Sequence, residues 1–168
     1  SKMAVLERHD AGAVTRLVMN APERLNALSD KMLAALHTSL DEIANDRSVR
    51  AVIISGNGKA FCAGHDLKQM TAGRQAEDGG RAYFKDLFDR CAAVMARVQT
   101  MPQPVIAQVH GIATAAGCQL VATCDMAIAA QDTKLGVNGC RLYTTDAADH
   151  LTRVRRTGQP LHSTLEHT

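Results

Sequence analysis

The chain has 168 residues, which is enough for one domain and too short for two of ordinary size. With 19 basic and 17 acidic residues the net charge is only +2, which excludes an electrostatic case for nucleic-acid binding. Apolar residues make up 46% of the chain, but aromatic residues only 3%, so the predicted core is aliphatic.

The cysteines and the apolar runs indicate the compartment. The five cysteines are odd in number and form no C-x-x-C pair, so we expect buried free thiols in a reducing environment. No apolar run is long enough to span a membrane, and no signal segment follows Ser1. We expect a bacterial cytoplasmic protein or, after removal of a transit peptide, a mitochondrial matrix protein. We expect no membrane contact and no metal, because no ligands lie at metal spacing.

The first part of the chain predicts a hairpin, a helix and a buried strand. Residues 4–8 and 13–19 are strand-like and flank a turn at residues 10–12. Ser29 is a candidate N-cap, because its hydroxyl can accept from the free amides of a first helical turn. A strand is expected at 51–55. The helix before it, to about residue 45, is indicated by apolar residues at helical spacing: Met32, Leu33, Leu36, Leu40 and Ile43.

The next part alternates helices with strands. Residues 69–80 are polar and rich in glycine, which predicts a mobile loop. The apolar stripe over 84–98 predicts a helix that packs on the core, and a strand is expected at 105–109. A short helix at 115–124 and a buried strand at 126–130 complete the pattern. This alternation is typical of right-handed parallel crossovers, so the predicted fold class is α/β.

The character of the sequence changes near residue 136. Beyond it the periodicity is lost and apolar residues are scattered singly. We therefore divide the chain into a folded core over 1–135 and a tail over 136–168 that is poorly ordered or loosely packed.

Two turns of small residues follow two of the predicted strands. The first covers residues 61–67 and contains Gly64; the second covers residues 110–119 and contains Gly111. Such turns can leave backbone N–H groups unpaired, and two donors aimed at one carbonyl oxygen form an oxyanion hole. Small residues at strand–helix junctions also serve close packing alone, and the residues leave that alternative open. Neither turn has a Ser or Cys in a strand-to-helix elbow.

Three segments resemble the signature segments of the enoyl-CoA hydratase/isomerase (crotonase) family. They are NAPERLNAL at 20–28, AFCAGHDL at 60–67 and VHGIATAAGCQLVATCD at 109–125. Their order and spacing match the family over residues 4 to about 130, and residues 64–67 and 115–125 resemble one particular branch. The resemblance implies a spiral of ββα units, the ClpP/crotonase fold. It also implies acyl-CoA substrates, no cofactor beyond the coenzyme A that the substrate carries, a role in fatty acid metabolism, and homotrimers or hexamers.

The resemblance also implies roles for individual residues. The two oxyanion amides would be the backbone N–H groups of His65 and Ala116, with the His65 ring incidental. Arg24 would pair with a coenzyme A phosphate. The implied substrate-binding residues are Arg24, Leu25, Ala27, Ala63, Gly64, Asp66, Leu67 and Ala115.

The sequence departs from the family at both catalytic acids. Gln119 stands where a hydratase has its first glutamate, and an amide cannot exchange a proton near neutral pH. The second glutamate falls at Gly136 or Gly139, depending on the register. The usual addition of water is therefore not predicted. The resemblance ends near residue 138, and the C-terminal helical part of the family fold is missing.

Three classes of function remain open. The leading one is an acyl-CoA lyase or isomerase of this family, although this chain is expected to bind coenzyme A esters weakly and to turn over poorly. The second is a non-catalytic acyl-CoA-binding or regulatory homologue. The third is a relative of the Clp proteases, which would need a serine nucleophile in the second turn, where the chain has Ala115, Ala116 and Cys118.

Overall fold

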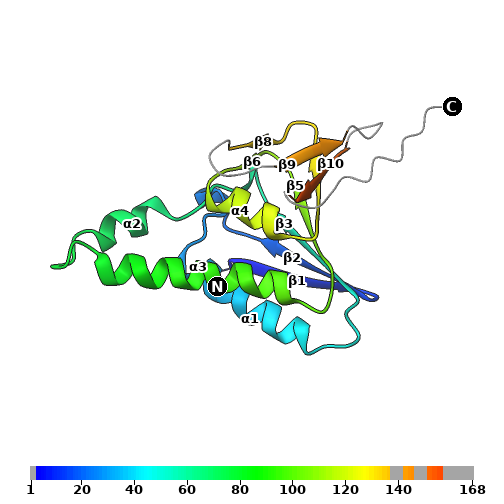
Figure 1. Ribbon diagram of the computed structural model, residues 1–168, viewed down its shortest axis with the longest axis horizontal. Coiled ribbons are helices and arrows are strands. Elements are labelled where there is room, and N and C mark those ends of the chain that lie inside the picture. Colours follow the sequence, from blue (N-terminus) through cyan, green and yellow to red (C-terminus); the bar gives the residue numbers. More distant parts are fainter. Residues whose placement is uncertain (1–2, 137–141, 146–150, 157–168) are drawn as a thin grey trace.

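A seven-stranded sheet forms the centre of the molecule (Figure 1). The computed structural model describes residues 3–136, 142–145 and 151–156. The strand order in this sheet is β1-β2-β3-β5-β7-β10-β9. The middle strands β2, β3, β5 and β7 are parallel, whereas β1, β10 and β9 pair antiparallel with their neighbours. The strands are β1 (Leu6–Ala11), β2 (Val14–Met19), β3 (Ala51–Gly56), β5 (Val105–Val109), β7 (Met126–Ala130), β9 (Leu142–Thr145) and β10 (Leu151–Arg156).

A second, smaller sheet contains three short parallel strands, β4 (Ala60–Cys62), β6 (Ile112–Ala113) and β8 (Lys134–Leu135). Each short strand directly follows a long strand of the large sheet, as β4 follows β3 and β6 follows β5. Helices then connect one such strand pair to the next. This repetition of two strands and a helix is the predicted ββα spiral, and the α/β fold class is confirmed.

In the part of the chain that the structure describes, four α-helices and one short 3-10 helix connect the strands. Helices α1 and α3 pack against each other, and α4 contacts α3 and the small sheet. Helix α2 lies at one end of the molecule, away from the sheets (Figure 1). The helices are η1 (Pro22–Arg24), α1 (Asp30–Ala44), α2 (Leu67–Gly73), α3 (Arg81–Thr100) and α4 (Ala116–Thr123).

The predicted start of the first long helix is confirmed. The Ser29 hydroxyl accepts a hydrogen bond from the Met32 amide at 3.1 Å, which satisfies one amide of the first turn. Leu36 and Leu40 of the same helix face are fully buried. The core that they join is aliphatic, as expected, and Phe61 is its one fully buried phenylalanine among the described residues.

The predicted loop at 69–80 is wrong for its first part. Residues 69–73 belong to α2, which the Asp66 side chain caps by accepting from the amides of Lys68 (2.9 Å) and Gln69 (3.1 Å). No residue of α2 is buried, so the helix has no apolar stripe that a sequence pattern could detect. The hairpin is confirmed, but its turn lies at Gly12 and Ala13 rather than at residues 10–12.

The expectation of free thiols holds for some cysteines only. Cys62 and Cys91 are buried free thiols. Cys118 is disulfide-bonded, so the expectation of a free thiol is wrong for this residue. No C-x-x-C spacing in the sequence indicates this bond. Most of the tail assigned to 136–168 lies outside the described residues. Within the described part, no helix is both long and apolar enough to cross a membrane.

Candidate functional site

The first small-residue turn is held by the segment that precedes α1. Gly64 has a φ of +91°, a conformation that residues with a Cβ rarely adopt. The Ala63 amide donates to the Leu25 carbonyl at 3.0 Å, and the Leu28 amide donates to the Gly64 carbonyl at 2.7 Å. These two bonds lay residues 24–28 alongside the turn.

A buried asparagine fixes the shape of that segment. The Asn26 side chain is fully buried and donates to the carbonyls of Asn57 and Ala60, both at 2.9 Å. It also accepts from the Ala21 amide at 2.8 Å, so the amide group is well satisfied. Asn26 itself has a φ of 51°, which asparagine tolerates better than most residues. Sequence reasoning missed this role, although asparagine inside an apolar run was a usable signal.

The two small-residue turns lie directly against each other. The Thr114 amide donates to the Cys62 carbonyl at 3.1 Å. A Cβ placed on Gly64 would lie only 3.1 Å from the Ala115 Cβ, and a Cβ placed on Gly117 would overlap the Cys62 carbonyl oxygen. Glycine at these two positions therefore permits the contact between the turns.

The backbone donors at this contact are not engaged elsewhere in the described part of the chain. There, neither the His65 N–H nor the Ala116 N–H donates a hydrogen bond to any group. Ala116 is the first residue of α4, where amides lack helical partners and carry a partial positive charge. Two neighbouring free donors of this kind can hold one oxygen that carries negative charge.

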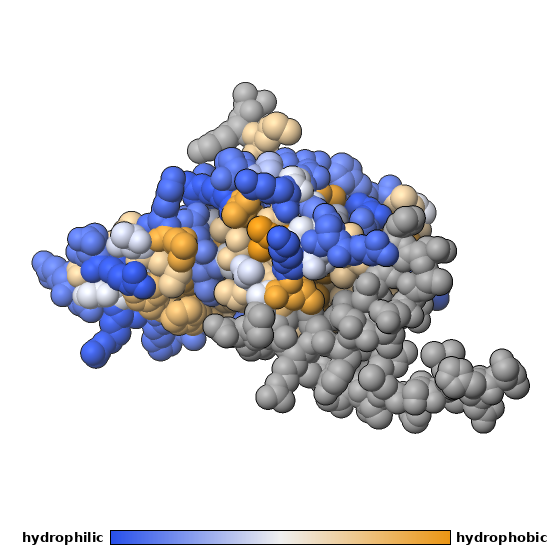
Figure 2. All heavy atoms as spheres, turned by 90° about the horizontal axis from the view of Figure 1, so that it is seen from above, coloured by the Kyte–Doolittle hydropathy of each residue, from blue (hydrophilic) through white to orange (hydrophobic). Residues whose placement is uncertain are grey.

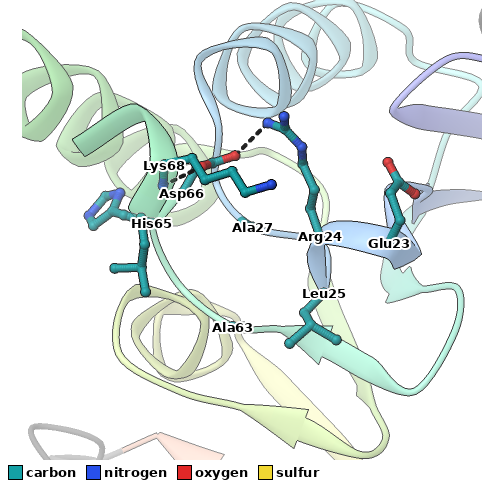
Figure 3. A pocket seen from close by; sticks show the side chains of 9 residues that line it. Glu23, Arg24, Leu25, Ala27, Ala63, His65, Asp66 and Lys68 are labelled. Atoms are coloured by element: carbon teal, nitrogen blue, oxygen red, sulfur yellow. Dashed lines mark hydrogen bonds and ion pairs between the residues drawn. The ribbon is translucent and has the colours of Figure 1, made fainter. Parts of the chain in front are cut away.

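A pocket of about 250 Å³ lies on one side of the first turn; we call it the Arg24 pocket. Figure 3 shows Arg24 reaching across it to Asp66, with Nη1 and Oδ2 2.7 Å apart. Asp66 is buried and caps α2 with its other oxygen, whereas the Arg24 side chain is 47% exposed and keeps further N–H donors. The lining residues are Glu23, Arg24, Leu25, Ala27, Ala63, His65, Asp66, Leu67 and Lys68.

A second pocket, of about 490 Å³, lies between α3 and α4; we call it the α3–α4 pocket. Its lining residues are His65, Phe88, Cys91, Ala92, Met95, Ala115, Ala116 and Gln119. His65 is the one residue common to both linings. Seen from above, apolar side chains gather in the middle of the face that carries α4, and polar ones at the α2 end (Figure 2).

The imidazole and the two thiols beside the turns are neutral near pH 7. Burial lowers the pKa of the His65 imidazole, and the Leu28 backbone offsets this only in part. Near neutral pH the ring is therefore uncharged. Burial raises the pKa of the Cys62 thiol to about 12 and also raises that of Cys91, so neither is a thiolate.

Most of the predicted site residues line one of the two pockets. Gln119 lies on the α3–α4 pocket with an exposed side chain. Gly136 packs against Thr114, and Gly139 lies outside the described residues. Of the predicted substrate-binding residues, Arg24, Leu25, Ala27, Ala63, Asp66 and Leu67 line the Arg24 pocket, Ala115 lines the other, and Gly64 lies between the turns.

Sequence reasoning missed several residues of both pockets. Lys68 and Glu23 line the Arg24 pocket, but their sequence context is that of ordinary surface charges. Phe88, Cys91 and Met95 line the α3–α4 pocket, although their stripe predicted core packing alone. Across residues 3–136, 142–145 and 151–156, no three metal-ligating side chains gather in one place.

The family is decided by a match to a family model. The model described as enoyl-CoA hydratase/isomerase matches residues 9–160. The chain belongs to the enoyl-CoA hydratase/isomerase family. The matched residues run past residue 138, where the sequence alone places the end of the resemblance.

Individual members of the enoyl-CoA hydratase/isomerase family agree with this assignment. The mitochondrial enoyl-CoA hydratase domain-containing protein 3 of Xenopus laevis is 42% identical over 126 residues, covering 75% of this chain and 41% of that protein. The human protein of that name has a crystal structure that is similar to this one, with a TM-score of 0.72 and 36% sequence identity. The match covers 80% of this chain and 51% of that chain. This is the branch that residues 64–67 and 115–125 resemble.

A bacterial member of the family is also similar in structure. The crystal structure of an enoyl-CoA hydratase of Mycobacterium smegmatis is 52% identical, with a TM-score of 0.74; 80% of this chain covers 51% of it. The chain spans about two fifths of the length of the similar curated proteins from vertebrates. The relatives include proteins named as mitochondrial and proteins from bacteria.

Proposed function

We propose that this chain binds acyl-CoA thioesters and stabilises an enolate-like state of the thioester. The coenzyme A part occupies the Arg24 pocket, and the acyl group occupies the α3–α4 pocket. The observation that carries the proposal is the position of His65, which lines both pockets beside two unengaged amides. A ligand that fills both pockets places its thioester carbonyl at this junction.

Two cationic side chains of the Arg24 pocket suit a phosphate-bearing ligand, and two acidic ones, Glu23 and Asp66, line the same pocket. Arg24 and Lys68 both line the pocket, and Arg24 offers N–H donors that its ion pair with Asp66 does not use. Because Asp66 holds one nitrogen of the guanidinium, the Arg24 side chain is oriented before the ligand arrives. The small side chains of Ala27 and Ala63 leave room for the narrow pantetheine arm.

The two amides provide the chemistry. Removing a proton from the carbon next to a thioester, or breaking a bond to that carbon, places negative charge on the carbonyl oxygen. The N–H groups of His65 and Ala116 would hold that oxygen, and loss of one such donor typically raises the barrier by about 2.7–4 kcal/mol. Gln119 cannot transfer a proton, so the proposed activity stops at enolate stabilisation and does not include the usual hydration.

The test separates binding from enolate stabilisation. Acetyl-CoA measures binding by calorimetry, and acetoacetyl-CoA, which enolises readily, measures enolate stabilisation through its ultraviolet absorbance. Ala116→Pro removes one amide at the first helical position, and Ala116→Ser keeps the amide. Because a proline restricts the residue before it, thermal melting verifies that the fold around Ala115 is intact in Ala116→Pro. We expect Ala116→Pro to weaken enolate binding roughly 100-fold and Ala116→Ser to change it less than about twofold.

Other outcomes favour other functions. Binding of acetyl-CoA without any enolate signal would support a non-catalytic acyl-CoA-binding homologue, which the amide of Gln119 also favours. Absence of binding by either thioester to the wild-type chain would contradict the proposal itself. Equal enolate signals from Ala116→Pro and the wild type would remove Ala116 from the donor pair.

A further inference from the structure

The α3–α4 pocket has an aromatic wall. The rings of His65 and Phe88 both line it, with their centroids 5.7 Å apart and their planes at 70°, an edge-to-face pair. Phe84 stacks behind Phe88 at 6.2 Å with an angle of 25° between the rings. The whole sequence has only three phenylalanines, two tyrosines and no tryptophan, so the placement of two phenylalanines here is distinctive.

Phe88 is not needed by the core of the protein. It is 51% exposed, whereas its neighbour Leu87 is 1% exposed and belongs to the buried stripe of α3. Its ring is positioned by contacts with other rings rather than by burial. A half-exposed phenylalanine on a pocket wall presents a ring surface that a ligand can cover.

The rest of the pocket is lined by uncharged side chains, most of which are small or contain sulfur. Met95 and Cys91 contribute sulfur atoms, which make favourable contacts with aromatic rings. Ala92 and Ala115 are small and leave width for a flat group. No charged side chain lines the pocket among the described residues, and the amide of Gln119 is the one polar side chain there besides the neutral imidazole. Such a lining does not suit an acyl group that ends in a carboxylate.

We infer that this pocket selects acyl-CoA thioesters whose acyl group carries an aromatic ring, which packs against Phe88 and His65. The inference rests on the proposed function, since it takes the α3–α4 pocket as the acyl site. An aliphatic acyl chain gains binding free energy from burial against any apolar pocket wall. An aromatic ring gains in addition from its quadrupole, because the rings of the wall can meet it edge-to-face or offset-stacked.

The experiment compares a flat aromatic acyl group with a saturated one of the same ring size, and uses acetyl-CoA as the reference without a ring. Phenylacetyl-CoA, cyclohexylacetyl-CoA and acetyl-CoA are titrated into the wild type and into Phe88→Leu. We expect the wild type to bind phenylacetyl-CoA about two- to tenfold more tightly than cyclohexylacetyl-CoA. In Phe88→Leu that ratio falls to about one; acetyl-CoA, whose acyl group carries no ring, measures any general loss of thioester binding in this variant. Phe88→Tyr keeps a ring and is expected to keep the preference.

The outcomes distinguish this inference from the proposed function. Should acetyl-CoA bind while phenylacetyl-CoA has no advantage in the wild type, the aromatic preference is wrong and the proposed binding of acyl-CoA thioesters stands. An advantage that survives in Phe88→Leu also overturns the inference. Absence of acetyl-CoA binding to the wild type overturns both. Phe88→Leu is expected to fold, because Phe88 is half exposed, and thermal melting verifies this.

Discussion

Ala115 carries the most unusual backbone conformation beside the site. Its φ is 50° and its ψ is −123°, in a region that residues with a Cβ rarely enter. The residue immediately precedes α4 and its Cβ lies close to Gly64, so the strain occurs at the contact between the two turns. Sequence patterns gave no sign of it, because an alanine at a strand–helix junction is ordinary.

Glycine at residue 115 is expected to stabilise the fold. Relief of the strained backbone is worth about 1–3 kcal/mol, and the greater freedom of glycine in the unfolded chain costs about 0.4–1 kcal/mol. Ala115→Gly should therefore raise the free energy of unfolding by about 1 kcal/mol in urea titrations. Ala116→Gly is the control, which should lower it, because residue 116 is helical. A lower stability of Ala115→Gly would refute the assignment of strain.

At the scale of elements, apolar stripes decided what the sequence could predict. Helices α1 and α3 bury one face each, so their spacing revealed them. Helix α2 buries no residue, and its start depends on the Asp66 cap, a local signal that the polar composition of residues 69–80 concealed. Arg74 lies 5.6 Å from the centre of the Phe84 ring and helps to hold the end of α2 to α3.

The cap of α2 can be separated from the ion pair by two substitutions. Asp66→Ala removes both the cap and the partner of Arg24, whereas Asp66→Asn removes the charge and keeps a good capping side chain. Loss of a cap costs about 1 kcal/mol, so hydrogen exchange at the amides of Lys68 and Gln69 should become about fivefold faster in Asp66→Ala. Asp66→Asn should stay near the wild type. Equal acceleration in both variants would assign the effect to the ion pair.

At the scale of the whole molecule, the order of strands and helices was enough to predict a parallel α/β sheet. The two pockets could not be derived in this way. The Arg24 pocket needs residues 24–28 to lie beside the first turn, an arrangement that depends on the buried side chain of Asn26. The α3–α4 pocket needs Phe88 to face outward while the residue before it faces the core. Periodicity shows which residues share a helix face but not what lies opposite.

The close contact between α4 and strand β4 depends on Gly117. In Gly117→Ala the added methyl group would overlap the Cys62 carbonyl, and the gain in helix propensity offsets only part of that cost. We expect a loss of about 1–2 kcal/mol of stability and, because the turns move apart, at least tenfold weaker binding of acetyl-CoA. Gly79→Ala is the control, because the added methyl group would meet no neighbour and the backbone of residue 79 lies in the left-handed region. This variant should lose stability without losing affinity for acetyl-CoA. Normal affinity in Gly117→Ala would show that the contact is not required.

Because the two cavities have only His65 in common, they can be filled by separate fragments. Free coenzyme A and a small uncharged arene would then occupy the protein at the same time, each with its own modest affinity. Joining such fragments through one sulfur atom makes the second association intramolecular. The linked molecule therefore binds much more tightly than either fragment alone.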